Sequence, residues 1–415
     1  MSGSPLAALT TMTLLVVGCA NAAPTPGTTS APASVGPTSA AATDIAAVVR
    51  GNTRFALDLY AELSAREAGN IFFSPQSVST ALAMTSAGAR GETAAQMAQT
   101  LHFSLPDETL HTAFGELDDA LNAGSNGGSI LLATANRLWG RHGEPFLPAY
   151  LDGINRHYRG GFQTVDFAAN LEASRRLIND WVSHQTLQRI DDLLQAGDLD
   201  PASALVLTNA IFFKGAWRTP FDPQYTRPHS FRTADGTTVE TPMMWGTIAC
   251  SYHAADLFQA IELPYDGERL AMLILLPRQH DGLARLEAAL TPDALERWLG
   301  AMKPASMSVA LPRVELESRF DLAATLSVMG MPLPFSAAAD FSGMNGRRGL
   351  FISTVIHQAN LTVNEEGSEA AAATAVSMKR GGRAFRAEHP FLFLVRDRKT
   401  GAILFLGRVA DPSTS

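Results

Sequence analysis

The side chains best suited to metal binding or covalent catalysis are ten histidines and two cysteines, and their spacing supports neither chemistry. Cys19 and Cys250 form no CxxC pair for zinc, and the histidines are scattered without metal-ligand spacing. The GxSxG, HExxH, GxxxxGK(S/T) and GxGxxG signatures are absent. Because a Ser-His-Asp triad is assembled in space, a dispersed triad stays open as an alternative. The sequence therefore predicts a protein without a metal, a cofactor or enzymatic activity.

The segment that stands out is residues 363–386, in which an acidic stretch, an alanine run and a basic stretch follow one another. Glu365 and Glu366 precede Ala370–Ala375, a run of alanine with one threonine, and Lys379-Arg380 opens the basic end. By helix propensity alone, this pattern indicates a solvated helix followed by a basic loop. The pattern by itself leaves the function of the segment open.

Composition sets outer limits on the fold and the partners. The chain has 415 residues, 46% of them hydrophobic, which is enough for one large core or two ordinary ones. A net charge of −8 favours solubility and argues against a general nucleic-acid binder. Two cysteines are too few for a disulfide scaffold, so packing must hold the fold together.

The N-terminus has the features of an export signal. Leu6–Val17 is an apolar run of signal-peptide length, too short to span a bilayer. It ends in Val16-Val17-Gly18-Cys19, which resembles the lipobox of bacterial lipoproteins, so residues 1–19 are predicted to be a signal peptide with Cys19 lipidated. No Lys or Arg precedes Arg50, unlike ordinary export signals, and an uncleaved apolar tail is the alternative.

Residues 20–43 are predicted to form a disordered tether. Ala20–Thr43 contains only Ala, Asn, Pro, Thr, Gly, Ser and Val, a composition that cannot offset its ordering entropy. The expected location is therefore secreted, extracellular or on the cell envelope as a lipoprotein. With Cys19 lipidated, Cys250 is expected to be a reduced, buried thiol.

The folded part is predicted to be one domain, residues 44–415, beginning at Asp44 as a helix N-cap. Three- and four-residue apolar spacing predicts a helix over 45–63, another through Ile178–Gln185, and a third over Phe320–Met329 with Gly330 as its cap. Ser77–Ala87 is also predicted to be helical, opened by Ser74-Pro75 and closed near Gly88. Short apolar runs predict the strands Leu205–Phe213, Leu270–Leu276, Phe391–Val395 and Ile403–Leu406, the last two as a hairpin. Without strict β-α alternation, the pattern indicates an α+β fold.

A series of ordered motifs over nearly the whole folded length resembles those of the serpin family. The motifs are Asn70–Pro75 with Ser77–Ser79 and Ala81–Met84, Thr208–Gly215 with Trp217 and Pro220-Phe221, Leu263–Tyr265, Leu276-Pro277, Asp340–Met344 with His357, His389–Phe391, and Phe405–Val409. One such motif would be a weak sign, whereas the series in this order is highly specific. The chain is identified on this basis as resembling a bacterial, inhibitory serpin.

The resemblance implies a serpin fold with three β-sheets, eight or nine helices and an exposed reactive-centre loop. It also implies a monomeric suicide substrate whose partner is a serine protease. The protease cleaves the loop and forms an acyl-enzyme, and the freed loop then inserts as an extra strand in the large sheet. The alternatives are a non-inhibitory serpin that acts as a carrier or chaperone, and an inhibitor of cysteine proteases.

The resemblance also assigns roles to single residues. Four polar residues fall in the shutter beneath the sheet that opens: Ser74, Ser77, Asn209 and His357. Trp217 falls where the loop first enters, and Glu365 at the base of the loop would pair with Arg313. The plainer interpretations are satisfied polar residues of the core and an exposed ion pair of little energetic value.

The hinge of the loop discriminates an inhibitor from a carrier. It is predicted to consist of Glu365, Glu366, Gly367, Ser368, Glu369, Ala370, Ala371, Ala372, Ala373 and Thr374. Insertion turns alternate side chains inward, where a large or charged group is costly to bury. Ser368, Ala370, Ala372 and Thr374 share the inward parity and are small, while Glu369 faces outward. This parity favours inhibition.

The scissile bond is placed by counting along the loop from both ends. Seventeen residues from Glu365 end at Gly381, and the short stretch before His389 draws the site back to about Lys379. Because a trypsin-like pocket demands Lys or Arg, Arg380-Gly381 is the predicted bond and a trypsin-like protease the predicted target. Lys379-Arg380 is second, and Met378-Lys379, for a chymotrypsin- or elastase-like target, is third. The remaining interpretation is a solvated basic loop that no target protease recognises.

Overall fold

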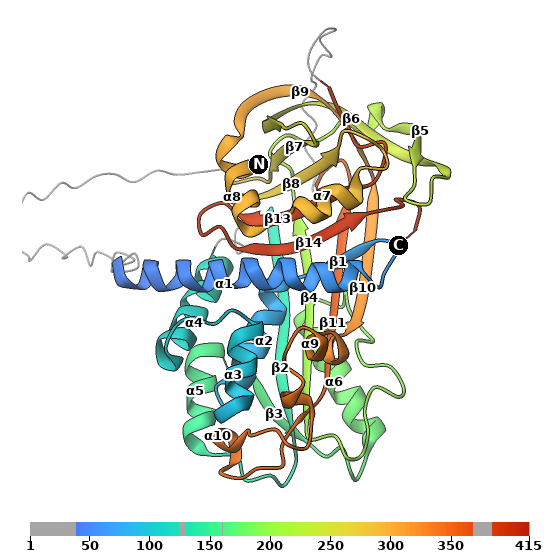
Figure 1. Cartoon of the computed structure of the whole chain (residues 1–415). Coiled ribbons are helices and arrows are strands. Elements are labelled where there is room, and N and C mark those ends of the chain that lie inside the picture. The colour runs from blue at the N-terminus through green and yellow to red at the C-terminus, as the bar shows by residue number, and fades with distance from the viewer. Residues whose placement is uncertain (1–38, 124–128, 160, 368–383, 415) are drawn as a thin grey trace, which may run out of the picture. The chain divides into compact units, whose positions relative to one another are not determined.

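The computed structural model describes residues 39–123, 129–159, 161–367 and 384–414, and Ser39–Ser415 forms one compact unit (Figure 1). The α-helices of this part are α1 (Ser39–Ser64), α2 (Pro75–Ser86), α3 (Gly91–Thr100), α4 (Asp107–Ala123), α5 (Pro148–Tyr158), α6 (Leu171–Gln185), α7 (Leu283–Ala289), α8 (Pro292–Ala301), α9 (Ala323–Val328) and α10 (Ser342–Asn345), with two 3-10 turns, η1 (Pro223–Tyr225) and η2 (Leu333–Phe335). The strands are β1 (Ile71–Phe73), β2 (Ile130–Arg141), β3 (Phe162–Val165), β4 (Leu205–Gly215), β5 (Arg227–Arg232), β6 (Thr238–Ala254), β7 (Phe258–Pro264), β8 (Leu270–Pro277), β9 (Lys303–Pro312), β10 (Val314–Asp321), β11 (Ile352–Val363), β12 (Ala384–Arg386), β13 (Phe391–Asp397) and β14 (Ile403–Val409).

The five-stranded sheet has the order β10-β11-β4-β2-β3. Its two central strands, β11 and β4, run parallel and pair from Ile352 and Leu205 to Leu361 and Phe213. Each is antiparallel to its other neighbour, β10 or β2. Helix α2 packs on this sheet, and α6 packs with the segment after it on β2, β4 and β11. Coverage on both faces explains why β4 reads as a continuous apolar run rather than an alternating one.

The second sheet has nine strands in the order β1-β14-β13-β8-β7-β6-β9-β12, with β5 added on β6. The 17-residue strand β6 pairs with β5 near one end, with β9 along its length and with β7 at the other end. Because β6 pairs with β5, β7 and β9, all nine of these strands form one hydrogen-bonded sheet. The described part therefore has two separate hydrogen-bonded sheets, where three were expected, and ten α-helical segments, of which α10 has only four residues.

Helix α2 begins as the sequence predicts. Ser74 has extended backbone, and its side chain accepts a hydrogen bond from the Ser77 N–H at 3.3 Å. Pro75 occupies the first turn, where its missing N–H costs nothing. The helix is buried along nearly its whole length because it lies between the five-stranded sheet and the neighbouring helices α1 and α3. The predicted hairpin of β13 and β14 is likewise confirmed.

Two predicted helix boundaries are wrong. Helix α1 begins at Ser39, so the last residues of the predicted tether are helical and Asp44 is not its N-cap. Ala40–Ala42 are strong helix formers, and they extend the helix beyond the point where its apolar stripe begins. Helix α9 begins at Ala323 because Phe320 and Asp321 belong to β10 and pair with β11. Gly330 does follow α9 with φ of +124°, as the predicted cap requires.

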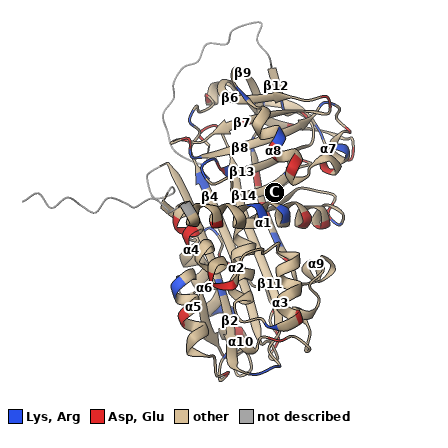
Figure 2. Ribbon diagram, turned by 60° about the vertical axis from the view of Figure 1, so that its left-hand side comes forward, with Lys and Arg blue, Asp and Glu red and all other residues tan. Residues whose placement is uncertain are grey.

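Basic and acidic residues are interspersed over the described ribbon, as Figure 2 shows. Within the described ranges, no helix combines the length and the apolar composition needed to cross a membrane. The one cysteine of this part, Cys250, is buried and unpaired, as predicted, and burial raises the pKa of its thiol to about 11.

Candidate functional site

The chain reverses direction immediately after β11. The Asn364 N–H donates to the Gly367 carbonyl at 3.1 Å, and the Gly367 N–H donates to the Asn364 carbonyl at 3.2 Å. Gly367 has φ of +107°, and a Cβ atom there would collide with backbone atoms of Gly215 and Trp217. Only glycine fits this position. The turn therefore lies directly against the end of β4.

The segment after β4 holds this turn in place. The backbone N–H of Trp217 donates to the Glu366 carbonyl at 2.9 Å, and its indole Nε1 donates to the Asn364 carbonyl at 3.0 Å. The Trp217 ring stacks on Tyr265 at 4.5 Å between centroids. The Phe221 N–H donates to the Glu365 carbonyl at 2.8 Å. Two residues of one short segment thus satisfy backbone groups of the turn, and Tyr265 supports the indole ring.

Glu365 is buried at the base of the predicted loop, with 4% of its surface exposed. Arg313 Nε lies 2.8 Å from both carboxylate oxygens, and the Thr226 hydroxyl donates to Oε1. Burial alone would raise the pKa of Glu365, but the hydrogen bonds from Arg313 and Thr226 outweigh it and hold the pKa below its usual value. The pair predicted from the sequence is present, and its carboxylate is buried rather than exposed.

The four polar residues predicted for the shutter lie in one hydrogen-bonded network between α2, β4 and β11. The Ser74 N–H donates to His357 Nε2 at 3.0 Å, and His357 Nδ1 contacts Asn209 Oδ1. Asn209 Nδ2 donates to Ser77 Oγ at 2.6 Å. His357 and Asn209 are opposite one another in the parallel register of β11 and β4. The network therefore joins the two central strands to the start of α2.

Asn136 is a member of this network that the sequence did not indicate. Its Oδ1 accepts from Ser77 Oγ at 2.9 Å and from Asn209 Nδ2. It lies in β2, opposite Asn209 in the antiparallel register. An asparagine inside an apolar strand is a signal of a buried polar contact, but only the pairing of β2 with β4 identifies the partner.

Stability at mildly acidic pH is expected to depend on His357. Burial lowers the pKa of His357 to about 3, below the value of about 6.5 for a free imidazole. Between these values the unfolded chain binds a proton that the folded chain does not. The part of the free energy of unfolding that depends on the neutral His357 should therefore be fully present above pH 6.5. Below pH 6.5 it should fall as the pH falls, by up to about 1.4 kcal/mol per pH unit.

Urea unfolding at pH 7 and pH 5 checks this expectation. His357→Gln should lose less stability between the two pH values than the wild type, whatever its stability at pH 7. His253→Gln, at a partly exposed position of β6, is the matched control. His111 and His389, whose pKa values burial also lowers, are present in all three proteins and cancel in the comparison. Equal losses in His357→Gln and wild type would contradict it.

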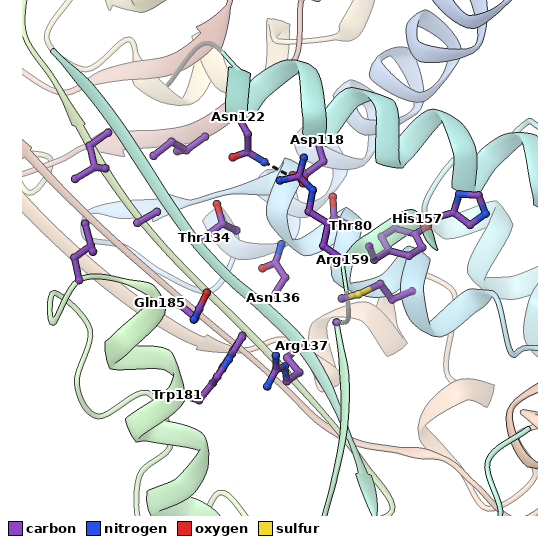
Figure 3. Close-up of a pocket in the computed structure, with 17 residues that line it drawn as sticks. Thr80, Asp118, Asn122, Thr134, Asn136, Arg137, His157, Arg159, Trp181 and Gln185 are labelled. Carbon is purple, nitrogen blue, oxygen red and sulfur yellow. Dashed lines mark hydrogen bonds between the residues drawn. The ribbon is translucent and has the colours of Figure 1, made fainter. Parts of the chain in front are cut away.

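A cavity of about 460 Å³ adjoins the polar network (Figure 3). It is lined by residues of α2, α4, β2, α5 and α6, and Asn136 belongs both to its wall and to the network. Asp118 and Asn122 lie at one end, where Asn122 donates to Asp118 at 3.0 Å, and Arg137 and Trp181 lie at the other. None of the residues that line this cavity was predicted from the sequence as a site residue.

The remaining predicted site residues lie outside the described part of the chain. They are the hinge residues Ser368, Glu369, Ala370, Ala371, Ala372, Ala373 and Thr374, the residues of the candidate reactive bonds Met378, Lys379, Arg380 and Gly381, and the lipidation site Cys19.

Comparisons with known proteins match nearly the whole folded part. A family model described as "Serpin (serine protease inhibitor)" matches residues 50–412. The human leukocyte elastase inhibitor is 42% identical over 87% of this chain and 98% of its own length. An uncharacterized serpin-like protein of the archaeon Thermococcus kodakarensis is 39% identical over 88% of this chain and 86% of its own. The structure of human thyroxine-binding globulin complexed with thyroxine matches with a TM-score of 0.82 and 31% identity, over 90% of this chain and 99% of that one.

Proposed function

Since the chain belongs to the serpin family of serine protease inhibitors, which are not enzymes, we propose that it inhibits its target as a suicide substrate. The protease cleaves a bond within the loop that begins after Gly367, and it is held there as an acyl-enzyme. The freed loop then inserts between β4 and β11 and carries the protease with it.

The parallel pairing of β4 with β11 is the observation that carries this proposal. A strand that leaves the turn at Asn364–Gly367 runs antiparallel to β11, and therefore antiparallel to β4 as well. Inserted between them, it would replace one parallel ladder by two antiparallel ones, which are slightly more stable per residue. The turn already places Gly367 at the entrance to this space, against Gly215 and Trp217.

The residues around the turn and the network have separate parts in this proposal. Trp217, Glu365 and Arg313 hold the entrance closed before cleavage, because Trp217 fixes the turn against the end of β4 and Arg313 fixes Glu365 to the start of β10. His357 and Asn209 must part when the strands separate. Ser74, Ser77 and Asn136 then supply alternative partners, so that no buried polar group is left unsatisfied.

The proposed target is a trypsin-like protease that cleaves Arg380-Gly381. The support is the chemistry of the side chain, because a pocket with a buried carboxylate selects Arg or Lys. An elastase-like target is the second candidate, since a relative with 42% identity is named as a leukocyte elastase inhibitor. For an elastase-like target, the candidate scissile bond is Met378-Lys379.

Gel electrophoresis and mass spectrometry distinguish these targets. Incubation with trypsin should give a complex that resists SDS and releases a C-terminal peptide beginning at Gly381. Arg380→Ala should abolish the complex with trypsin, while Arg386→Ala, at the described strand β12, should leave it intact. A peptide beginning at Lys379, or complexes only with elastase-like enzymes that Arg380→Ala does not affect, would assign the second target instead.

A carrier function is the alternative within the family, because the matching structure of thyroxine-binding globulin is a complex with thyroxine. The two functions differ in the fate of the protease once it has cleaved the loop. An inhibitor traps the protease, whereas a carrier is cleaved and releases it. The absence of SDS-stable complexes with trypsin, elastase, chymotrypsin and a cysteine protease, together with cleavage by any of them, would favour the carrier.

We extend the proposal to location: the protein is a secreted monomer or a lipoprotein of the cell envelope anchored at Cys19, in a bacterium. The support is Val16–Cys19 and the composition of residues 20–38. Metabolic labelling with palmitate should mark the wild type, and Cys19→Ser should lose the label. An unlabelled wild type that is found in the medium would indicate ordinary secretion.

A further inference from the structure

The outer face of β6 and β9 is built of small, uncharged side chains. Alternate residues of these strands, such as Ile248 and Val309, belong to the main core, so the residues between them point outward. The outward-facing residues are Thr247, Ala249, Ser251, Pro304, Ser306 and Ser308. Strands β6, β9 and β12 lie together at one end of the described ribbon (Figure 2). None of these side chains is large or charged, so another protein can rest directly on the sheet.

An exposed cation without a counterion in the described part lies at the edge of this face. The guanidinium carbon of Arg227, on β5, is 5.0 Å from the ring centroid of Trp245 on β6. Arg386 lies over the same ring at 5.5 Å, but Glu388 is 3.7 Å from it and compensates its charge. His229, edge-on to the ring, also contacts Glu388. No ion pair joins Arg227 to any described residue, which makes it a local positive charge on a chain of net charge −8.

The proposed reactive bond is close to this face because the chain that follows it is short. Ala384 begins β12, which pairs with β9, and Arg380 precedes it by four residues. A chain extends at most about 3.6 Å per residue, so the Cα atoms of Arg380 and Ala384 are within about 14 Å of one another. A protease of about 220 residues has a radius of gyration of about 17 Å. A protease docked on this bond therefore overlies part of the surface around β12.

We propose that the target protease rests on the outer face of β6 and β9, and that Arg227 favours proteases whose surface beside the active site is acidic. This inference rests on the proposed inhibitory function and adds a surface property of the partner to it. Contact with the ring of Trp245 holds the Arg227 side chain at the edge of the face. Because Arg227 is exposed there, its charge acts mainly on the rate of association, through an attraction that salt screens.

An anionic and a cationic trypsin test this inference, because both cleave after Arg and Lys and they differ in surface charge. At low salt, Arg227→Glu should lower the second-order rate constant of inhibition for the anionic trypsin by at least about fivefold, and should not lower it for the cationic one. At about 1 M NaCl, where the Debye length is about 3 Å, the difference should disappear. Arg347→Glu makes the same change of charge at an exposed position after α10, at the opposite end of the ribbon (Figure 2), and should leave both rates within about twofold of the wild type.

A second position guards against misfolding of the Arg227 variant. Ser308→Glu places a negative charge on the outer face of β9 and leaves Arg227 in place, and it should also slow the anionic trypsin. Ser308→Lys should accelerate it. If Arg227→Glu and Ser308→Glu inhibit the anionic trypsin at the wild-type rate, or slow both trypsins equally, the protease does not rest on this face and the inference is overturned.

Binding of an anionic trypsin whose catalytic serine is replaced by alanine separates this inference from inhibition itself. Calorimetry should show that Arg227→Glu weakens this binding by at least about fivefold relative to the wild type. Weaker binding of the variant without any SDS-stable complex with active trypsin would keep the contact face and remove the suicide inhibition. SDS-stable complexes that form at unchanged rates would keep the inhibition and overturn the contact face. No binding of the inactive trypsin and no complex with the active one would overturn both.

Discussion

Cleavage of the chain between Val376 and Arg383 is expected to raise its melting temperature by tens of degrees. The nicked loop can insert between β4 and β11, where it exchanges one parallel ladder for two antiparallel ones. The net gain is one ladder of about a dozen hydrogen bonds at about 1 kcal/mol each. At about 2 °C per kcal/mol for a chain of this size, the increase is on the order of 20 °C.

The measurement is a melting curve of the intact and the nicked protein, followed by far-UV circular dichroism. Cleavage by a nonspecific protease at low concentration suffices, since any cut within this range frees the same hinge. As the control, a cut in the predicted tether before Ser39 should leave the melting temperature unchanged. Identical curves for the intact and the loop-cleaved protein would contradict insertion and favour the carrier function.

Ser368→Arg is expected to turn the inhibitor into a plain substrate. Ser368 follows the turn at Gly367 and has the parity that faces inward on insertion. A guanidinium buried there without a partner costs several kcal/mol. Each ~1.4 kcal/mol added to the barrier slows insertion by about tenfold, so hydrolysis of the acyl-enzyme wins. Covalent complex should fall by more than about a hundredfold, while the intact variant keeps its fold and its melting temperature.

Glu369→Arg is the matched control, because the next residue along the strand faces outward. It carries the same new side chain and should retain covalent complex within a few-fold of the wild type. The measurement is the yield of SDS-stable complex at equal protease, together with the yield of cleaved chain. If Ser368→Arg still forms complex, or if both variants lose it equally, alternation of inward and outward side chains is not what governs insertion.

Much of the site could be predicted from the sequence because its residues lie in motifs with local structural meaning. Ser74-Pro75 marks a helix start by capping chemistry, and the structure has α2 there. The pairing of Glu365 with Arg313 was also anticipated. The structure adds that the carboxylate is buried at the turn, which depends on Thr226 and the end of β4. The hydrogen-bond partners of a side chain often come from distant segments that pack against it. Residue spacing along the chain does not predict these partners.

The two helix boundaries that were predicted wrongly, the starts of α1 and α9, also depend on residues outside the pattern used to predict them. Asp44 is a good N-cap by type, yet the alanines before it extend α1 to Ser39. Phe320 continues an apolar helical spacing, but β11 offers it a strand ladder, and pairing overrides local propensity. The division into sheets likewise depended on β6 remaining continuous along its whole length. Local preference is worth tenths of a kcal/mol per residue, and a tertiary ladder exceeds it.

By itself, the sequence determined the family, the α+β class, the terminal hairpin, four residues of the network, and the Trp217, Glu365 and Arg313 positions at the turn. Those features follow from residue type, apolar period and the order of motifs, which are all properties of the linear amino-acid sequence. Only the tertiary structure decided that β4 and β11 are parallel neighbours, that Asn136 joins Asn209, and that a cavity lies beside this network. These depend on which distant strands lie side by side, and that choice is made by burial of the whole core.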